Sequence, residues 1–172
     1  MEKPTVDIII PVYKPDHTLC LLLQKLQEQT FVVHQIILVN TEERLWEEYL
    51  QTESVRKCLE KMTIPLEIFH VSKEGFDHGG TRNLAVGKSQ ASYFICMTQD
   101  ALPQDKFLVE RLLAPFREQD VAAVYARQQA REDCSPIEAY TRSFNYPDRD
   151  RIKSKEDIPA LGIKTFFCSN VC

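Results

Sequence analysis

Polar side chains follow the ends of three predicted strands. One apolar strand leads to Tyr13, another stops at Asp100, and a third precedes a glycine turn that carries Arg82 and Asn83. Because the carboxyl ends of parallel strands meet at one edge of a sheet, we expect these groups to lie close together. Open α/β sheets bind ligands at that edge. The pattern predicts a nucleotide-type ligand and, through Asp100, a metal ion.

Asp100 is the candidate metal ligand. It follows the apolar residues 94–97 and Thr98, so its carboxylate lies just past the carboxyl end of a buried strand. Magnesium and manganese prefer oxygen ligands of this kind, and such a cation would neutralise a diphosphate. An aspartate shortly before Pro103 is also common in turns, and a turn cap explains Asp100 equally well by position. The residues leave both interpretations open.

The glycine turn places three of the five glycines within residues 75–80. Amides at a helix start bind anionic groups, and Arg82 can form bidentate hydrogen bonds to them. The spacing matches neither Gly-x-Gly-x-x-Gly nor a phosphate loop, which argues against a dehydrogenase or an ATPase. The alternative is a tight loop in which glycine supplies positive φ and His78 is an ordinary loop residue.

Tyr13 ends the first predicted strand, at the same edge of the sheet. An aromatic ring at this point can stack on a nucleobase. Packing of the ring under the following loop is an equal alternative.

Short apolar runs alternate with helical patterns along the whole chain. Strands are expected over residues 6–12, 36–39, 66–71, 93–97 and 121–125, since each run is of the kind buried in parallel sheets. Helices are expected over residues 19–26, 42–62, 81–89, 106–116 and 137–144, with a surface loop over 145–159. The alternation predicts an α/β fold with a mostly parallel sheet flanked by helices.

Composition narrows the class of protein. The 172 residues suffice for one domain with a core, and a formal net charge of −4 without a basic block argues against nucleic-acid binding. The six cysteines have neither zinc nor disulfide spacing, so we expect buried thiols in a reducing compartment. No signal peptide and no run of roughly 18 apolar residues is present, which predicts a cytoplasmic protein able to work at a membrane surface.

The last residues, 166–172, form an apolar, strand-like run without a polar tail. A natural domain seldom stops inside such a segment. We therefore expect a chain that is truncated at its C-terminus.

These segments resemble the family 2 glycosyltransferases of the GT-A fold. The likeness rests on Pro11-Val12-Tyr13-Lys14-Pro15 after the first strand, on Gln29-Thr30 after the first helix, and on Arg82-Asn83. A narrower likeness, to the rhamnosyltransferase branch, rests on residues 76–83, 97–103, 125–128, 144–147, 162–165 and 169–170. The similarity of each segment alone is weak evidence, but six such segments in the family's order are specific. The similarity covers nearly the whole chain.

The resemblance implies a site for a nucleotide sugar, built from residues at the strand ends. Pro11, Tyr13 and the turn Asn40-Thr41-Glu42 would border the nucleobase. The turn His78-Gly79-Gly80 and Arg82 would close over the base and the donor. Gln99 would lie beside the ribose and diphosphate, and Asp100 would hold Mg²⁺ or Mn²⁺.

The resemblance also implies an activity. An enzyme of this branch would transfer rhamnose from dTDP-rhamnose, with inversion, to a saccharide or lipid-linked saccharide of a surface polysaccharide, in the cytoplasm at the inner face of the plasma membrane. Residues 1–172 would be the nucleotide-sugar-binding part of one GT-A domain. The general base is expected beyond residue 172, so no catalytic residue is assigned. The family usually has two or more acids at the metal motif, whereas Gln99-Asp100-Ala101 has one.

Two alternatives stand beside this prediction, and a third is excluded. A family 2 transferase with a UDP- or GDP-sugar donor fits the same residues. A non-catalytic nucleotide-binding module fits the single acid at the metal motif and the missing base. A Rossmann-type oxidoreductase does not fit, because Tyr13-Lys14-Pro15 stands where its glycine fingerprint would follow the first strand.

Overall fold

The computed structural model describes residues 4–118, 120–130, 134–165 and 170–172. It divides into two compact units. The first, here called the sheet unit, consists of Met1–Val124 with Val171–Cys172. The second, here called the helical unit, consists of Tyr125–Asn170. The prediction of a single domain over residues 1–172 stays a prediction, and each unit is described by itself.

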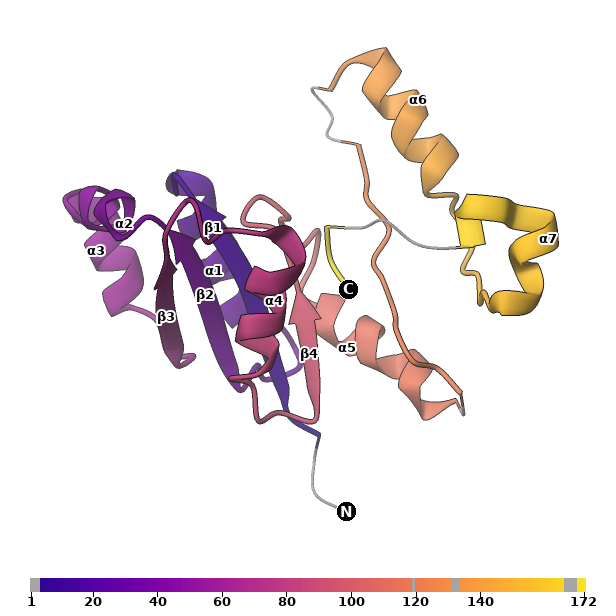
Figure 1. Cartoon of the computed structure of the whole chain (residues 1–172), viewed down its shortest axis with the longest axis horizontal. Coiled ribbons are helices and arrows are strands. Elements are labelled where there is room, and N and C mark those ends of the chain that lie inside the picture. The colour runs from indigo at the N-terminus through magenta and orange to yellow at the C-terminus, as the bar shows by residue number, and fades with distance from the viewer. Residues whose placement is uncertain (1–3, 119, 131–133, 166–169) are drawn as a thin grey trace. The chain divides into compact units, whose positions relative to one another are not determined.

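Four parallel strands form the centre of the sheet unit (Figure 1). They are β1 (Val6–Tyr13), β2 (Gln35–Thr41), β3 (Leu66–Val71) and β4 (Tyr93–Cys96), in the spatial order β3-β2-β1-β4. The register places Ile9 of β1 opposite Ile37 of β2 and Cys96 of β4. The predicted α/β fold with a mostly parallel sheet is confirmed.

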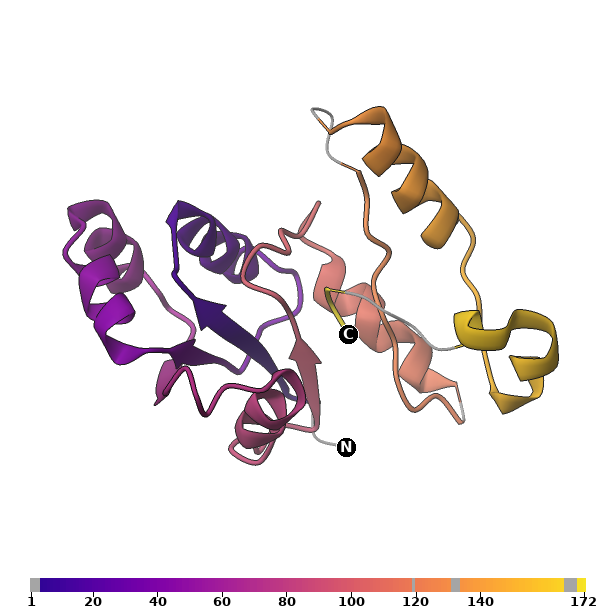
Figure 2. The ribbon, with the colours of Figure 1, turned by 45° about the horizontal axis from the view of Figure 1, so that its top comes forward.

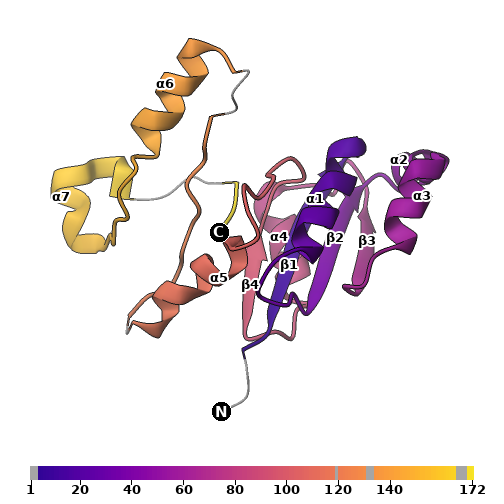
Figure 3. The same ribbon diagram turned by 180° about the vertical axis from the view of Figure 1, so that it is seen from behind.

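Helices cover both faces of this sheet. Helix α1 (His17–Gln27) lies on one face and α4 (His78–Val86) on the other (Figures 2 and 3). On the α4 face, Ala85 packs in a buried cluster with Ile9 of β1 and Ile37 of β2. Side chains alternate along a strand, so the fully buried Ile8 and Ile10 lie on the α1 face. Because both faces are covered, β1 is apolar almost throughout.

The helix expected over residues 42–62 is two helices, α2 (Glu43–Leu50) and α3 (Glu53–Glu60). Tyr49 is buried in α2 and Val55 in α3. In one continuous helix the six steps between them would turn about 600°, leaving them about 120° apart. The break at Thr52, whose ψ of 121° is extended, lets both side chains be buried.

The prediction of a strand over residues 121–125 is wrong, because this segment has no regular structure. On the outer side of β4 the described backbone partner is instead the end of the chain. The N–H of Cys96 donates to the carbonyl of Cys172 over 2.6 Å, and the N–H of Cys172 donates back over 3.0 Å. Residues 166–169 of the predicted strand-like run lie outside the described residues.

Two other helix boundaries differ from the prediction. Helix α5 is confined to Leu108–Leu113 and passes into the 3₁₀ helix η1 (Ala114–Arg117). Pro115 has no N–H to donate to the carbonyl four residues earlier, so an α-helix cannot continue regularly there. Helix α4 begins at His78 instead of residue 81, because Asp77 caps its first turn.

The helical unit contains α6 (Pro136–Asn145), η2 (Lys155–Asp157), α7 (Ile158–Leu161) and η3 (Gly162–Thr165). The prediction of a helix over residues 137–144 is thus confirmed. The prediction of a loop over residues 145–159 is wrong where η2 and the start of α7 lie. Two segments of the rhamnosyltransferase-like pattern are in contact here, since the Lys164 ammonium lies 4.1 Å from the Phe144 ring centroid. Gln128, of a third segment, accepts through its amide oxygen from the guanidinium of Arg142 in α6. Ser169 of that pattern lies outside the described residues.

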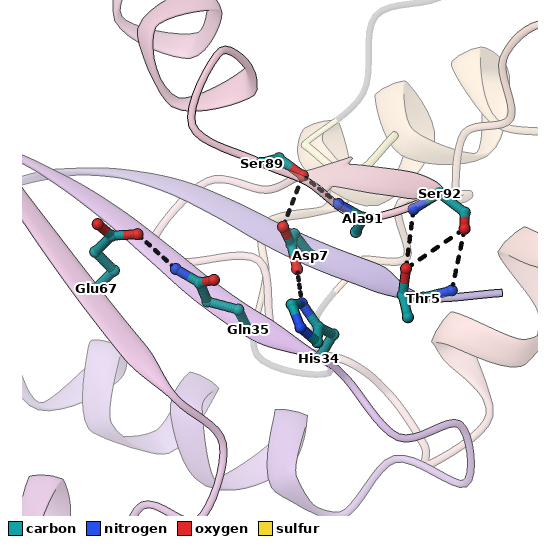
Figure 4. Close-up of polar contacts among 8 residues, drawn as sticks. All are labelled: Thr5, Asp7, His34, Gln35, Glu67, Ser89, Ala91 and Ser92. Carbon is teal, nitrogen blue, oxygen red and sulfur yellow. Dashed lines mark hydrogen bonds and ion pairs between the residues drawn. The ribbon is translucent and has the colours of Figure 1, made fainter. Parts of the chain in front are cut away.

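A fully buried carboxylate, that of Asp7, joins three segments of the sheet unit (Figure 4). One of its oxygens lies 2.7 Å from Nδ1 of His34, and the other accepts a 2.6 Å hydrogen bond from the Ser89 hydroxyl. Ser89 in turn accepts from the N–H of Ala91. The network lies near the start of β1, away from the carboxyl ends of the strands, and therefore supports the fold.

The cysteines are less buried than expected. Among those that the structure describes, Cys58 is buried, whereas Cys20, Cys96, Cys134 and Cys172 are partly exposed, and all five are free thiols. Within the described part of the chain, no helix is both long and apolar enough to span a bilayer.

Candidate functional site

The order of the strands defines the edge at which a ligand fits. From β1 the chain adds β2 and β3 on one side and then returns to place β4 on the other. In open parallel sheets the crevice beyond the carboxyl ends of the strands, where this reversal occurs, is the ligand site. Here the reversal lies between Tyr13, the last residue of β1, and the residues that follow β4.

Gln99 joins the two sides of this reversal. Its side-chain oxygen accepts from the N–H of Tyr13 over 2.9 Å, and its amide nitrogen donates to the carbonyl of Tyr13 over 3.0 Å. This pair of hydrogen bonds, here called the Gln99 clamp, holds the end of β1 against the loop after β4. Tyr13 as a residue is 37% exposed, and the Lys14 ammonium lies 5.3 Å from the centroid of its ring. The clamp therefore leaves the ring able to contact a ligand.

Asp100 follows the clamp directly and is exposed. Its Oδ1 accepts a 2.7 Å hydrogen bond from the Thr98 hydroxyl, and its backbone carbonyl accepts from the N–H of Leu102. Oδ2 has no hydrogen-bond partner among the described residues. The side chain thus acts as a cap of the turn, one of its two predicted roles. Its Oδ2 is still open to a ligand.

The donor set at this turn fits a cation that is held mainly by its substrate. Within the described ranges no three acidic, histidine or cysteine side chains gather into a metal cluster. Magnesium sites of enzymes that act on phosphates are commonly built from one or two carboxylates together with the phosphates and water. A single carboxylate at Asp100 satisfies that description.

The turn after β2 is built around Asn40, which is fully buried. Its Nδ2 donates to the carbonyl of Glu42 and lies 3.0 Å from Nδ1 of His70. Oδ1 of Asn40 and Oγ1 of Thr41 are buried without a hydrogen-bond partner among the described residues. Glu42 has a φ of 66°, a strained value for a residue other than glycine. The predicted base-binding residue Asn40 therefore holds the turn, and Glu42 is the member nearer the surface.

The glycine turn differs from the prediction in the use of its amides. The N–H groups of Gly79 and Gly80 both donate to the carboxylate of Asp77, over 3.2 and 2.5 Å. A Cβ on Gly80 would meet that carboxylate, which explains glycine at this position. These amides are therefore occupied by the cap rather than free for an anion.

Arg82 lies one turn into α4 and donates to the carbonyl of His78 over 2.8 Å. His78 is exposed, and its ring makes an edge contact with Phe76. Burial raises the pKa of the Cys96 thiol to about 11, the neighbouring Cys172 adds to this rise, and the Arg82 guanidinium partly offsets it. Arg82 belongs to the start of α4, the helix that follows β3 along the chain.

The predicted residues thus fall into three groups at one edge. Tyr13, Gln99 and Asp100 are joined directly, Asn40 and Glu42 form the turn after β2, and His78, Gly79 and Arg82 form the start of α4. The N–H of Glu42 donates to the carbonyl of Val71, tying the ends of β2 and β3. Pro11 lies two residues before the end of β1, opposite Val39 of β2, and is not part of these contacts.

Gln29 of the predicted Gln-Thr pair has a structural role. Its buried side chain donates to the carbonyls of Lys25 and Asp105 and accepts from the N–H of Val109. It thereby ties the end of α1 to the start of α5.

Sequence reasoning missed a hollow of about 600 Å³ between α1, α2 and α3. Residues directly after β1, among them Lys14, line one side of it. Inside, the Cys20 thiol lies 3.0 Å from the Tyr49 hydroxyl. Burial raises the pKa of Tyr49 far above its usual value and that of Cys58 to about 12. The Tyr49 hydroxyl and the Cys58 thiol therefore stay protonated at neutral pH.

The fold defines the class: an open, parallel α/β sheet of the kind that binds ligands at its strand reversal. The chain belongs to glycosyl transferase family 2, whose model matches residues 7–172. It is 34% identical over 166 residues to the O-antigen chain rhamnosyltransferase RfbN of Salmonella typhimurium, covering 96% of this chain and 50% of that protein. Against the O-antigen chain rhamnosyltransferase WbaN of Salmonella anatum the identity is 37% over 145 residues, covering 84% and 43%.

The chain spans about half the length of these curated relatives. Among solved structures, it resembles a mannosyltransferase from Pyrobaculum calidifontis in complex with GDP-Man and Mn²⁺, with a TM-score of 0.59 and 15% identity over 82% of this chain and 39% of that one. Glucosyl-3-phosphoglycerate synthase from Mycobacterium tuberculosis with UDP gives a TM-score of 0.52 and 12% identity over 74% and 46%. These likenesses show the GT-A fold.

Proposed function

We propose that this chain forms the donor-binding part of a glycosyltransferase that moves rhamnose from dTDP-rhamnose to a saccharide or lipid-linked saccharide acceptor. The observation that carries the proposal is the Gln99 clamp, which joins the exposed Tyr13 ring to the Asp100 carboxylate at the strand reversal. The two Salmonella relatives, both named O-antigen chain rhamnosyltransferases, support the sugar and the polysaccharide acceptor.

In the proposed complex the nucleobase lies against the Tyr13 ring and the turn at Glu42. An aromatic face and nearby polar backbone groups suit a flat heterocycle with polar edges. Arg82, at the start of α4, closes over the nucleotide from the third group of residues. Gln99 holds the ends of β1 and β4 in position beside the diphosphate.

Asp100 would hold a divalent cation, Mg²⁺ or Mn²⁺, through its free oxygen. When bound, such an ion stabilises the negative charge that develops on a leaving diphosphate. The acceptor hydroxyl attacks the anomeric carbon from the face opposite the diphosphate, and the bond from that carbon to the diphosphate oxygen breaks, so the anomeric configuration inverts. The proton of the hydroxyl goes to a base that we place outside residues 1–172.

Titration calorimetry of the chain with dTDP, UDP and GDP, each with and without Mn²⁺, tests this function. We expect metal-dependent binding that favours dTDP. A preference for UDP or GDP would keep a nucleotide-sugar transferase and change the donor. A failure of all three to bind would contradict the proposal and favour a module with another role.

Two variants locate the site. Asp100→Asn should abolish the Mn²⁺-dependent part of binding, whereas Asp150→Asn, at an exposed aspartate of the helical unit, should not. Arg82→Ala should weaken nucleotide binding even without metal. Its matched control is Arg56→Ala, since Arg56 also donates to backbone carbonyls, those of Leu50 and Gln51, away from the edge. Equal losses in Arg82→Ala and its control would refute the placement of α4.

We also propose a cytoplasmic protein that works at the inner face of the plasma membrane. The five described cysteines are free thiols, as is usual in a reducing compartment. A lipid-linked acceptor would bring the enzyme to the membrane surface. Fractionation of cells that express the full-length protein, with and without high salt, measures both the compartment and the peripheral attachment.

A further inference from the structure

Lys14 is the first residue after β1 and lies beside the Gln99 clamp. The clamp binds both backbone groups of Tyr13, the residue before Lys14, and it is made by the residue before Asp100. A lysine and an aspartate therefore follow the two strands that flank the reversal. One cationic and one anionic residue thus follow the two strands that border the proposed donor site, and Lys14 also lines the hollow between α1, α2 and α3.

The backbone of Lys14 is held in an unfavourable conformation. Its φ is 48°, in the left-handed region that residues other than glycine and asparagine rarely adopt. On one side the Gln99 clamp fixes Tyr13, and on the other Pro15 has a restricted φ and leads to Asp16, which caps α1. Strained backbone of this kind persists where its surroundings determine it, and it is common at ligand sites.

The charge of Lys14 is not used within the described structure. The side chain is exposed, and its ammonium forms no ion pair with any carboxylate of the described residues. The ammonium lies 5.3 Å from the centroid of the Tyr13 ring. An ammonium on a flexible stem next to an exposed ring is placed to reach an anionic group of a ligand that contacts that ring.

Charge balance at the metal motif favours the diphosphate as this anionic group. A dianionic diphosphate, the Asp100 carboxylate and one divalent cation together carry a single negative charge at neutral pH. One lysine brings this sum to zero, before the charge of Arg82, which we place over the nucleotide, is added. A second carboxylate at the metal motif would instead leave an excess of negative charge, so a single acid and a lysine suit each other.

We propose that Lys14 binds the diphosphate of the nucleotide sugar and supplies directly part of the charge neutralisation at the single-acid metal motif. This inference rests on the proposed function. It makes Lys14 a binding residue whose effect depends on the number of phosphates in the ligand. It also predicts that part of the nucleotide affinity persists without metal.

The test is calorimetric titration of the wild type, Lys14→Met and Lys14→Arg with dTDP, dTMP and thymidine, with and without Mn²⁺. Lys14→Met should weaken dTDP binding about tenfold, dTMP less and thymidine not at all, as expected when a charged hydrogen bond is lost. Lys14→Arg should retain most of the affinity. Lys61→Met, at an exposed lysine after α3, is the matched control and should bind as the wild type does.

Wild-type affinity for dTDP in Lys14→Met would overturn the inference while leaving the proposed function intact. An equal loss for dTDP and thymidine would also overturn it, because Lys14 would then act on the base through Tyr13. A wild-type chain that binds none of dTDP, UDP and GDP would overturn the proposed function, and the inference with it. Circular dichroism of each variant confirms that the fold is retained.

Discussion

Replacement of Gln99 by leucine removes the contact that joins the two sides of the proposed donor site. The variant loses two hydrogen bonds to the backbone of Tyr13, of 2.9 and 3.0 Å. A hydrogen bond of this type contributes roughly 0.5–1.5 kcal/mol net, so the pair contributes roughly 1–3 kcal/mol. Both bonds lie at an exposed edge where water replaces the lost partner, which favours the lower end of this range, about 1–1.5 kcal/mol.

The loss should appear in two measurements. Urea unfolding followed by the fluorescence of Trp46, the single tryptophan, reports the free energy of unfolding of the sheet unit. Without the clamp, dTDP binding must also bring the ends of β1 and β4 together. At a cost of about 1.4 kcal/mol, within the range above, calorimetry with dTDP and Mn²⁺ should show about a tenfold weaker affinity. Gln51→Leu is the matched control, because that exposed glutamine makes one long bond, of 3.4 Å, to the carbonyl of Glu47.

A glutamate at position 99 separates the clamp from metal binding. Gln99→Glu can still accept from the N–H of Tyr13 but cannot donate to its carbonyl, so it should lose about half of the stabilisation. Although the change adds a second acid beside Asp100, we expect no gain in Mn²⁺ affinity. A wild-type free energy of unfolding in Gln99→Leu, or tighter Mn²⁺ binding in Gln99→Glu, would refute the reasoning.

The other predictions concern the stability of the sheet unit. The Asp16 carboxylate caps α1, and its pKa is lowered from 3.8 chiefly by the N–H group two residues on. The capping stabilisation is therefore fully present above pH 3.8 and is lost as the pH falls through the lowered pKa of the folded state. Asp16→Ala should lower the free energy of unfolding by about 1 kcal/mol at pH 7, and in acid this free energy should converge with that of the wild type. Ser89→Ala leaves one oxygen of the buried Asp7 without its donor and should cost about 1.5–3 kcal/mol by urea unfolding; a loss below about 0.5 kcal/mol would contradict the burial of that charge. Gln29→Leu leaves the buried N–H of Val109 unpaired and should cost about 2–4 kcal/mol, while hydrogen exchange of that amide should rise more than that of β1. Uniform exchange across both elements would show that Gln29 does not hold α5 in place.

Local pattern determined the elements whose burial is set by their own residues. The apolar run of β1 and β2 requires cover on both faces, and the leucine spacing of α1 supplies one cover, so these elements were predicted within a residue or two. Alternation of strands and helices then leads to a parallel sheet. The placement of Tyr13 and Asp100 at its ligand edge followed from chain order alone, because parallel strands end at one edge.

Tertiary contacts decided what those residues do. Gln99 bonds to Tyr13, 86 positions away in the sequence, and Gln29 bonds to Val109, 80 positions away. Neither contact is therefore visible in the local pattern of the sequence. The outer side of β4 is paired by Cys172, and no periodicity near residues 121–125 reveals that this place is taken. Asn40 was predicted at the ligand but is fully buried beneath its own turn. Propensity and spacing describe a residue's neighbours in the chain, whereas hydrogen-bond partners and burial depend on which distant segments the packed sheet brings together.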